Sequence, residues 1–184
     1  MSPATKTRPS GRAAAAKDRG REFLKSVPLL ADLNAEELDL LWATVRRVGF
    51  SRGSVIMREG DVGDVMYFFA EGEVELTQKL TLKTGRHGFS QAEKSIVRLR
   101  AGSVSFFGDM ALFEREPRSA TITAAADCVL YEITRDDFER LSSAHPALGY
   151  KIMRRMAPVL CQRIRHSNQD VLKLTTALSI ALSK

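Results

Sequence analysis

The chain has 184 residues, of which 44% are hydrophobic and 27% are charged, which is the balance of one soluble globular domain and excludes collagen-like and fully disordered chains. No apolar run approaches the roughly 20 residues that span a bilayer, and the N-terminus lacks the apolar segment of a signal peptide, so we expect a cytoplasmic protein without a membrane span. The formal net charge of +6 comes from residues 1–20 and 151–184, while the middle of the chain is net acidic and therefore unlike a nucleic-acid-binding body.

The first predicted segments are a tail and a short helical region. Residues 1–20 combine Pro, Gly, Ser and unpaired charge with little to bury, so we predict a disordered basic tail. Residues 21–47 are predicted to form an N-terminal helical lead-in, in which Asn34 is the expected N-cap because acidic residues follow it in the first turn. Gly49 is expected to end this helix, and Trp42 to pack in the core.

Residues 48–134 have the pattern of a β-rich core. Short apolar pieces alternate with turn glycines, and many short strands at such spacing favour a sandwich or barrel. Strict alternation of acidic and apolar side chains over residues 73–76 is typical of a strand with one buried face. The polar stretch from Lys79 to Ser95 is expected to be a long, mobile hairpin loop.

Residues 135–184 return to a helical period and are predicted to form the C-terminal helices. A first helix opens at Asp136. Apolar residues recur at helical spacing along a second helix and, after a polar interval, beyond it: Leu148, Ile152, Met156, Leu160, Ile164, Val171, Leu174 and Leu178. Pro158 lies inside this pattern and is expected to kink the helix or mark a joint. A second copy of the chain would cover the distal apolar stripe in a parallel dimer; the alternative is that the stripe folds back onto the β-rich core.

The cysteines and histidines form no catalytic or metal-binding pattern. Cys128 and Cys161 lack the paired spacing of a metal or redox site, so both are expected to be buried as small hydrophobes. His87, His145 and His166 belong to no recognisable triad or ligand set, and each is expected at the surface. We therefore expect neither enzymatic activity nor a metal or cofactor.

One segment, residues 107–121, carries the chemistry of an anion site. Gly108 permits a tight turn, and a short helix begun just after it directs free N–H groups outward, where an anion is favoured. Arg118 adds a cation with forked donors, and the hydroxyl and backbone N–H of Ser119 add two more donors. Because a carboxylate repels phosphate, Asp109 should accept from a neutral hydroxyl instead. The segment therefore predicts a site for a sugar phosphate.

The same segment resembles the phosphate-binding cassette of the cyclic nucleotide-binding domain family. The resemblance rests on the turn glycines of residues 53–72 and on two runs at the family's spacing, Gly108-Asp109-Met110-Ala111-Leu112 and Pro117-Arg118-Ser119-Ala120-Thr121. It implies a mainly β fold with flanking α-helices. In this fold a jelly-roll-like β-roll of about eight strands lies between an N-terminal helical bundle and C-terminal B and C helices.

The resemblance also implies a role for each cassette residue. Arg118 is expected to bind the cyclic phosphate, and Asp109, where the family usually has Glu, to bind the ribose 2′-hydroxyl. The expected ligand-binding residues are Gly108, Asp109, Met110, Ala111, Arg118, Ser119 and Ala120, and the candidate base contacts are Thr121, Ser167 and Asn168. A plainer alternative makes Arg118 a surface residue paired with Glu114 or Glu116.

These expectations predict a stand-alone cyclic-nucleotide sensor, in which binding at the cassette moves the C-terminal helices and alters a protein interaction. Cyclic AMP is the default ligand, and the alternatives are cyclic GMP and cyclic di-GMP, whose second phosphate suits the basic C-terminal helix. Another alternative is an interaction module that keeps the fold without a ligand. The chain ends about 14 residues after Asp170, too few for a helix-turn-helix, so we expect no sequence-specific DNA binding. The expected partners are a second copy of the chain and an unidentified downstream protein.

Overall fold

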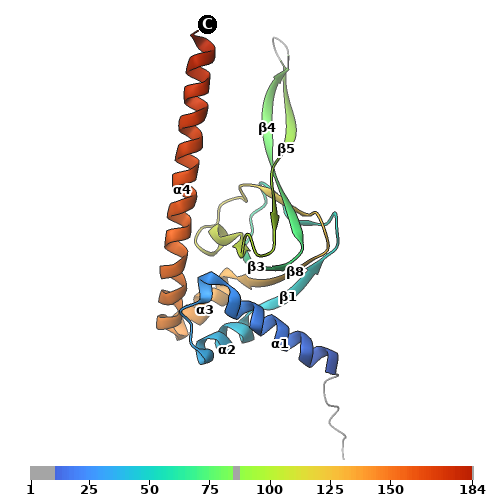
Figure 1. The fold of residues 1–184 in the computed structure, drawn as a ribbon, viewed down its shortest axis with the longest axis vertical. Coiled ribbons are helices and arrows are strands. Elements are labelled where there is room, and N and C mark those ends of the chain that lie inside the picture. Colours follow the sequence, from blue (N-terminus) through green and yellow to red (C-terminus); the bar gives the residue numbers. More distant parts are fainter. Residues whose placement is uncertain (1–10, 85–87, 184) are drawn as a thin grey trace, which may run out of the picture.

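Short apolar segments separated by turns form eight strands in the residues that the computed structural model describes, 11–84 and 88–183 (Figure 1). The strands are β1 (Arg46–Phe50), β2 (Val55–Met57), β3 (Val65–Glu71), β4 (Glu73–Thr84), β5 (Gly88–Arg100), β6 (Phe106–Phe107), β7 (Thr121–Ala124) and β8 (Cys128–Thr134). One four-stranded sheet has the order β1-β8-β3-β6 and the other the order β2-β7-β4-β5. Neighbouring strands are antiparallel throughout both sheets.

The helices flank this pair of sheets, which confirms the predicted mainly β class with flanking helices. They are α1 (Gly11–Ser26), the 3-10 helix η1 (Pro28–Leu30), α2 (Ala35–Thr44), the 3-10 helix η2 (Asp109–Leu112), α3 (Arg135–Ala144) and α4 (Pro146–Leu182). Helix α2 begins with a capping box, in which Asn34 accepts from the backbone of Glu37 and the Glu37 side chain accepts in return. This satisfies two N–H groups that have no partner within the helix.

Strand β3 joins two apolar cores because its side chains alternate between them. Met66 and Phe68 point to the helices, whereas Tyr67 and Phe69 point to the space between the sheets. The core between the sheets also includes Ile56, Val74, Phe107, Ile122 and Leu130. The core under the helices also includes Leu24, Leu41, Ile133, Leu148 and Met156. Trp42 packs against this second core as a partly buried residue.

The N-terminal segment differs from the prediction in two places. Helix α1 begins at Gly11, so the described part of the predicted disordered tail is helical, and only residues 1–10 lie outside the description. The run of four alanines at 13–16 accounts for this, because Ala has the highest helix propensity. Gly49 does not end a helix: α2 ends at Thr44, and Gly49 lies within β1, opposite Val129 of β8.

The polar stretch from Lys79 to Ser95 is not the predicted loop. Strands β4 and β5 pair from Glu73↔Arg100 to Thr84↔Gly88, and they form a long hairpin that projects from the body on the same side as the free end of α4 (Figure 1). Backbone pairing in a projecting hairpin does not need a buried apolar face. Its polar sequence therefore lacks the hydrophobic alternation by which strands are recognised.

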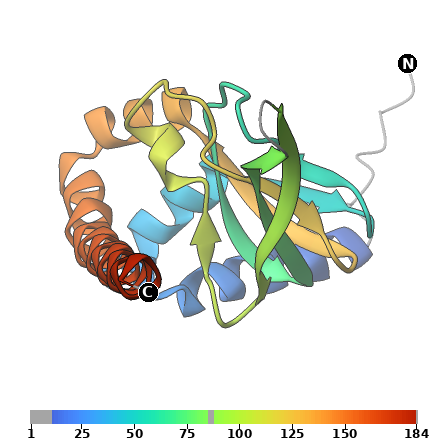
Figure 2. The same ribbon diagram turned by 90° about the horizontal axis from the view of Figure 1, so that it is seen from above.

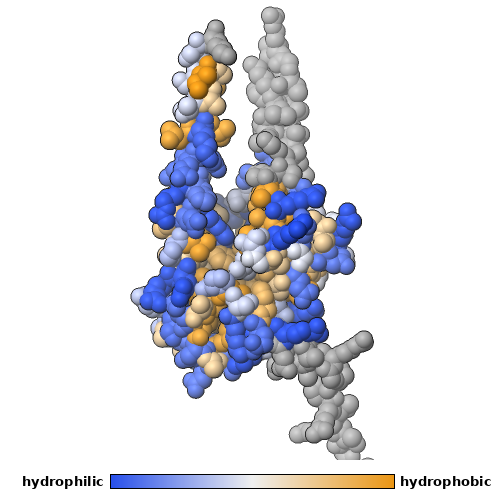
Figure 3. Space-filling model, in the orientation of Figure 1, coloured by the Kyte–Doolittle hydropathy of each residue, from blue (hydrophilic) through white to orange (hydrophobic). Residues whose placement is uncertain are grey.

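Helix α4 is one element of 37 residues that contains Pro158, so the proline does not mark a joint. Its first half packs on the domain through Leu148, Ile152 and Met156, and its second half extends beyond the body (Figures 1 and 3). Cys161 lies on this helix and is exposed, contrary to the prediction, whereas Cys128 is buried as expected. Its neighbours in the sequence are apolar, but Cys161 itself lies on an exposed face of the helix.

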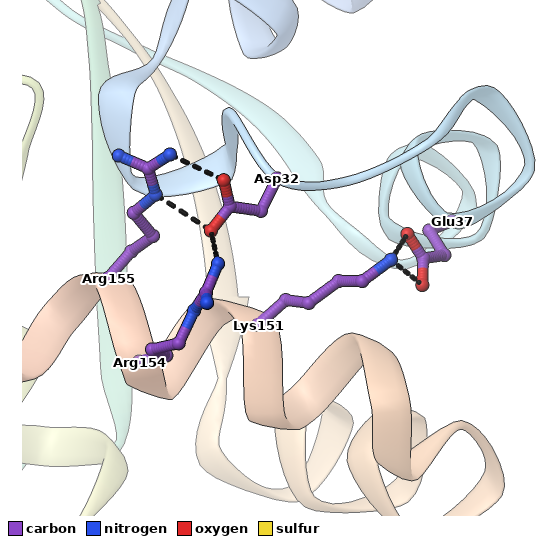
Figure 4. A network of polar contacts seen from close by, with 5 residues as sticks. All are labelled: Asp32, Glu37, Lys151, Arg154 and Arg155. Atoms are coloured by element: carbon purple, nitrogen blue, oxygen red, sulfur yellow. Dashed lines mark hydrogen bonds and ion pairs between the residues drawn. The ribbon is translucent and has the colours of Figure 1, made fainter.

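Ion pairs fasten the first half of α4 to the N-terminal helices (Figure 4). Lys151 Nζ lies 2.7 Å from both carboxylate oxygens of Glu37. Asp32 accepts from Arg154 Nη2 at 2.6 Å and from Arg155 Nε at 2.8 Å. These two arginines, Arg155 more than Arg154, hold the pKa of the Asp32 carboxyl well below its ordinary value of 3.8. The carboxylate thus stabilises the fold while it is ionised.

Replacing Asp32 should weaken this attachment in a pH-dependent way. Because the folded-state pKa of Asp32 is depressed, its stabilising effect is present above 3.8 and is lost as the pH falls below that value. We expect Asp32→Asn to have a lower Tm than the wild type at pH 7, with a gap that narrows as the pH falls below about 4 and shrinks in high salt.

Thermal unfolding followed by circular dichroism at several pH values measures this gap. Asp170→Asn is the matched control, since the ion pair of Asp170 with Lys173 lies within α4 and is exposed. Equal Tm values for wild type and Asp32→Asn at neutral pH and low salt would show that the ion pairs of Asp32 do not stabilise the fold.

Candidate functional site

A cavity of about 670 Å³ opens between the β2-β7-β4-β5 sheet, η2 and α4. Figure 2 shows η2, in yellow, between α4 and the strands. Most of the cavity wall is apolar and comes from Met57, Leu76, Val97, Leu99, Val104, Phe106, Phe107 and Ile122. Polar residues line it from two sides: from the cassette segment Asp109, Glu114, Glu116, Arg118 and Ser119, and from α4 Arg163 and His166. Few polar groups converging on an apolar hollow are typical of a small-molecule site.

The backbone turns into η2 at Gly108, which has a φ of +75°. A Cβ at this position would lie 3.0 Å from the Val65 carbonyl oxygen and 3.1 Å from Arg118 Nη1, so both backbone conformation and space require glycine. After the turn, the carbonyl of Ala111 accepts from Arg135 Nε at 2.9 Å and from its Nη2 at 2.6 Å. Arg135 is buried and holds the segment from behind; no sequence pattern points to this role.

Arg118 is held by backbone carbonyls rather than by acidic side chains. Its Nη2 donates to Val65 O at 2.7 Å and its Nη1 to Gly108 O at 3.2 Å. The guanidinium lies against Gly63, where a Cβ would come within 2.6 Å of it. In the described residues no ion pair joins Arg118 to Glu114 or Glu116, so the surface-pair alternative is not what the structure shows. Burial lowers the pKa of Arg118 from its ordinary value.

Asp109 is the most unusual group in the cavity because its carboxylate is buried and only half paired. Its side chain is 3% exposed, and Oδ1 accepts from Arg163 Nη1 at 2.7 Å. The other oxygen, Oδ2, is buried and has no hydrogen-bond partner. A buried acceptor without a donor is costly. A hydroxyl entering the cavity is therefore the group that this oxygen is suited to bind.

All seven predicted ligand-binding residues line the cavity: Gly108, Asp109, Met110, Ala111, Arg118, Ser119 and Ala120. The three candidate base contacts do not. Thr121 is buried and accepts from the backbone N–H of Glu59 at 3.0 Å. Ser167 and Asn168 are exposed on α4 and are absent from the cavity wall.

The two residues that α4 does contribute are Arg163 and His166, although the sequence pattern favours a solvated surface for both. His166 is exposed as expected but borders the cavity. The helical period could have found both. Positions Leu148, Ile152 and Met156 are buried, and steps of three and four from them lead to residues 159, 163 and 166. His145 is exposed at the start of α4, and His87 lies outside the described residues.

The cavity carries charges of both signs. Arg118 and Arg163 each bring a guanidinium, Asp109 brings a buried carboxylate, and the exposed Glu114 and Glu116 also line the wall. The guanidinium of Arg118, which lies beside the apolar wall, is the group suited to a small anion. Among the described residues no cluster of His, Cys, Asp and Glu has the arrangement of a metal site, and no helix in this part of the chain is both long and apolar enough to cross a membrane.

Comparisons with known proteins agree with this chemistry. Residues 47–145 match the family described as the cyclic nucleotide-binding domain. The chain is 36% identical over 134 residues to a cyclic nucleotide-gated potassium channel of Rhizobium etli, covering 73% of the chain and 33% of the channel. It is 33% identical over 119 residues to a cAMP-dependent protein kinase regulatory subunit of Yarrowia lipolytica, covering 65% of the chain and 28% of the subunit. The chain thus spans a third or less of these two relatives.

A solved structure is similar over a larger share of both chains. The crystal structure of a cyclic nucleotide-binding domain from Methylobacillus flagellatus superimposes with a TM-score of 0.68 at 25% identity, covering 87% of this chain and 84% of that one. With this much of both chains superimposed, the two proteins have the same fold.

The turn at Gly108 allows a direct test of how the site is built. Gly108→Ala is expected to lower the free energy of unfolding by more than the about 1 to 2 kcal/mol that a left-handed conformation costs an alanine, because the new methyl group also crowds Val65 and Arg118. Urea unfolding of both proteins measures the loss.

Gly53→Ala is the matched control, since Gly53 has a φ of +84° and no atom lies within 4 Å of the place that a methyl group would take. The free energy of unfolding of Gly53→Ala should fall only by the cost of the left-handed conformation. Equal losses for the two variants would show that close packing at Gly108 adds nothing.

Proposed function

Because the chain belongs to the cyclic nucleotide-binding domain family, we propose that it is a sensor that binds a cyclic nucleotide at residues 108–120 and converts binding into movement of α4. The observation that carries the proposal is that one cavity is lined both by Arg118 and by Asp109, whose buried Oδ2 has no hydrogen-bond partner. The proposed role is binding and not catalysis, and an altered protein interaction is its output.

Arg118 is the proposed phosphate ligand. Two of its five N–H donors are used on the carbonyls of Gly108 and Val65, which fixes the guanidinium plane and leaves donors for an anion. A preformed arginine loses little conformational freedom on binding, so most of its interaction energy goes into affinity. The hydroxyl of Ser119 lies in the same wall and is proposed as a further donor.

Asp109 is the proposed partner of the ribose 2′-hydroxyl, which would donate to Oδ2. Asp is one methylene shorter than the Glu usual in the family, but Arg163 holds its other oxygen, Oδ1, which fixes the orientation of the carboxylate. The apolar wall suits a purine. Cyclic AMP is the proposed ligand, since the related kinase regulatory subunits are named for dependence on cAMP, and cyclic GMP and cyclic di-GMP are the alternatives.

The output is proposed to pass through the distal part of α4. Apolar side chains there are exposed along one stripe, with Ile164 60%, Val171 60%, Leu174 71% and Leu178 59% exposed. Figure 3 shows apolar side chains on this projecting helix. Exposed apolar stripes at this spacing are typical of helix pairing. We propose that a second copy of the chain covers the stripe and that ligand binding changes the geometry of the pair.

Titration calorimetry tests the binding function. The wild type is expected to bind cyclic AMP, and Arg118→Ala to weaken binding about 100-fold or more, because a charge-assisted contact is lost. Cyclic GMP and cyclic di-GMP complete the ligand panel. Arg115→Ala is the matched control, since Arg115 is exposed in the same loop and does not line the cavity.

A second outcome would favour a different function. If none of the three ligands binds while α4 still engages a protein partner, and Arg118→Ala engages it equally well, the chain is an interaction module that keeps the fold without its ligand.

Sedimentation velocity tests the pairing of α4. We expect the wild type to sediment as a dimer and Leu174→Glu as a monomer, because burying a carboxylate in an apolar seam is costly and the two glutamates of a parallel pair would repel each other. Leu172→Glu is the matched control: Leu172 is 67% exposed but lies off the stripe, so this variant should remain dimeric. A wild type that is monomeric with and without cyclic AMP would contradict the pairing.

A further inference from the structure

A second hollow lies beside the cavity and opens between η1, the segment before β6 and α4. Its volume is about 590 Å³. Four residues border both spaces: Val104, Phe106, Arg163 and His166. The guanidinium carbon of Arg163 lies 5.2 Å from the centre of the Phe106 ring, in cation–π contact. This pair of side chains therefore forms part of the wall that the two spaces share.

The apolar part of the second hollow comes from η1, α4 and the residues around β6. Leu29 and Phe106 are buried, Val104 and Val159 are half-buried, and all four line the hollow. Such side chains are suited to contact with an aliphatic chain, because apolar surface is stabilised when it leaves water. Most of the cavity wall is apolar as well, so the two spaces differ chiefly in their charged groups.

The ionisable residues on the wall of the second hollow are all basic. They are Arg155, Arg163 and His166, and none of the described residues that line the hollow is acidic. The cavity, in contrast, is lined by three acidic residues. A carboxylate that enters the second hollow therefore meets no like charge on its wall.

The charge left after ion pairing lies at the Arg155 end of the second hollow. Arg163 donates to Asp109, so that pair is balanced. Arg154 and Arg155 share the single carboxylate of Asp32 (Figure 4), so two cations there face one anion. Arg155 uses Nε and Nη2 for Asp32, which leaves its Nη1 donors for another acceptor.

One surplus positive charge beside an apolar wall matches a monoanion with an apolar body. A carboxylate carries one negative charge, whereas a phosphate monoester carries between one and two at neutral pH. Gln162 lies about two helical turns beyond Arg155 and also lines the hollow, so its amide can donate to the same carboxylate.

We infer that the second hollow binds an amphipathic monocarboxylate, with the carboxylate at Arg155 and the chain along Leu29, Val159 and Phe106. This site is separate from the proposed nucleotide site, and the inference does not depend on that proposal.

Decanoate is the probe, and calorimetry on the full chain measures its binding. Octanoate is expected to bind about tenfold more weakly than decanoate, because two fewer methylene groups are buried. Decylamine has a chain of the same length with the opposite charge, and it is expected not to bind. Equal affinity for decanoate and decylamine would overturn the inference.

Substitutions on α4 test where the carboxylate lies. Arg155→Gln is expected to weaken decanoate binding about fivefold or more, because a charge-assisted contact is lost. Arg154→Gln is the matched control: Arg154 also pairs with Asp32 but does not line the hollow, so its effect should be less than about twofold. Equal effects of the two substitutions would overturn the assigned role of Arg155.

The exposed Gln162 allows a test that does not disturb an ion pair. Gln162→Glu should weaken decanoate binding about threefold, and Gln162→Lys should strengthen it by a similar factor. Gln169→Glu makes the same change of charge at an exposed position of α4 that does not line the hollow, and it should bind decanoate as the wild type does.

Two further variants exclude other places for the chain of decanoate. Arg118 lines the cavity but not the second hollow, and Leu174 is 71% exposed on the distal stripe of α4. Arg118→Ala and Leu174→Glu should therefore bind decanoate as the wild type does. Weaker binding by Arg118→Ala would place decanoate in the cavity, weaker binding by Leu174→Glu would place it on the stripe, and either result overturns the inference.

No binding of decanoate by the wild type overturns the inference as well, and it leaves the proposed binding of cyclic AMP untouched. If Arg155→Gln does not fold, the two substitutions of Gln162 decide, and equal affinity of both for decanoate overturns the inference.

Discussion

Three arginines, two of them from helices and one from the segment itself, hold residues 108–120 in the wall of the cavity. Arg135, at the start of α3, binds the backbone carbonyls of Ala111 and Glu114; Arg118 binds those of Gly108 and Val65; and Arg163 of α4 binds the carboxylate of Asp109. The segment contains only one short 3-10 helix, so many of its backbone carbonyls have no partner within regular secondary structure. Guanidinium groups, with several donors in a fixed plane, can supply such partners where regular secondary structure does not.

These contacts also explain why the two halves of α4 differ. The first half is fixed by apolar packing and by ion pairs to Asp32 and Glu37, neither of which lies in the cavity. Further along the helix, Arg163 is the last described residue with a side-chain polar link to the body, and that link ends on Asp109 in the cavity wall. The part of α4 that contacts the N-terminal helices and the part that contacts the cavity are thus distinct.

The sequence predicted those parts of the site whose contacts join residues close together in the chain. The turn at Gly108 depends on a few neighbouring residues, so the first run of the cassette predicted it. The second run predicted the guanidinium of Arg118 but not its partner Val65, which lies 53 positions away. The contact of Asp109 with Arg163 joins residues 54 positions apart and depends on the rotation of α4, which packing sets. The exposure of Cys161 and the strand pairing within the predicted hairpin loop of residues 79–95 were missed for a related reason, because helix rotation and backbone pairing leave little trace in the hydrophobic pattern.

The length of α4 beyond Arg163 gives the helix the properties of a lever arm. At 1.5 Å per residue, the helix extends about 28 Å from Arg163 to Leu182, so a tilt of about 10° at the cassette would displace the far end by about 5 Å. That displacement is close to one turn of helix, about 5.4 Å. A rigid helix attached to the cavity near one end would therefore turn a small tilt into a large movement at the other end.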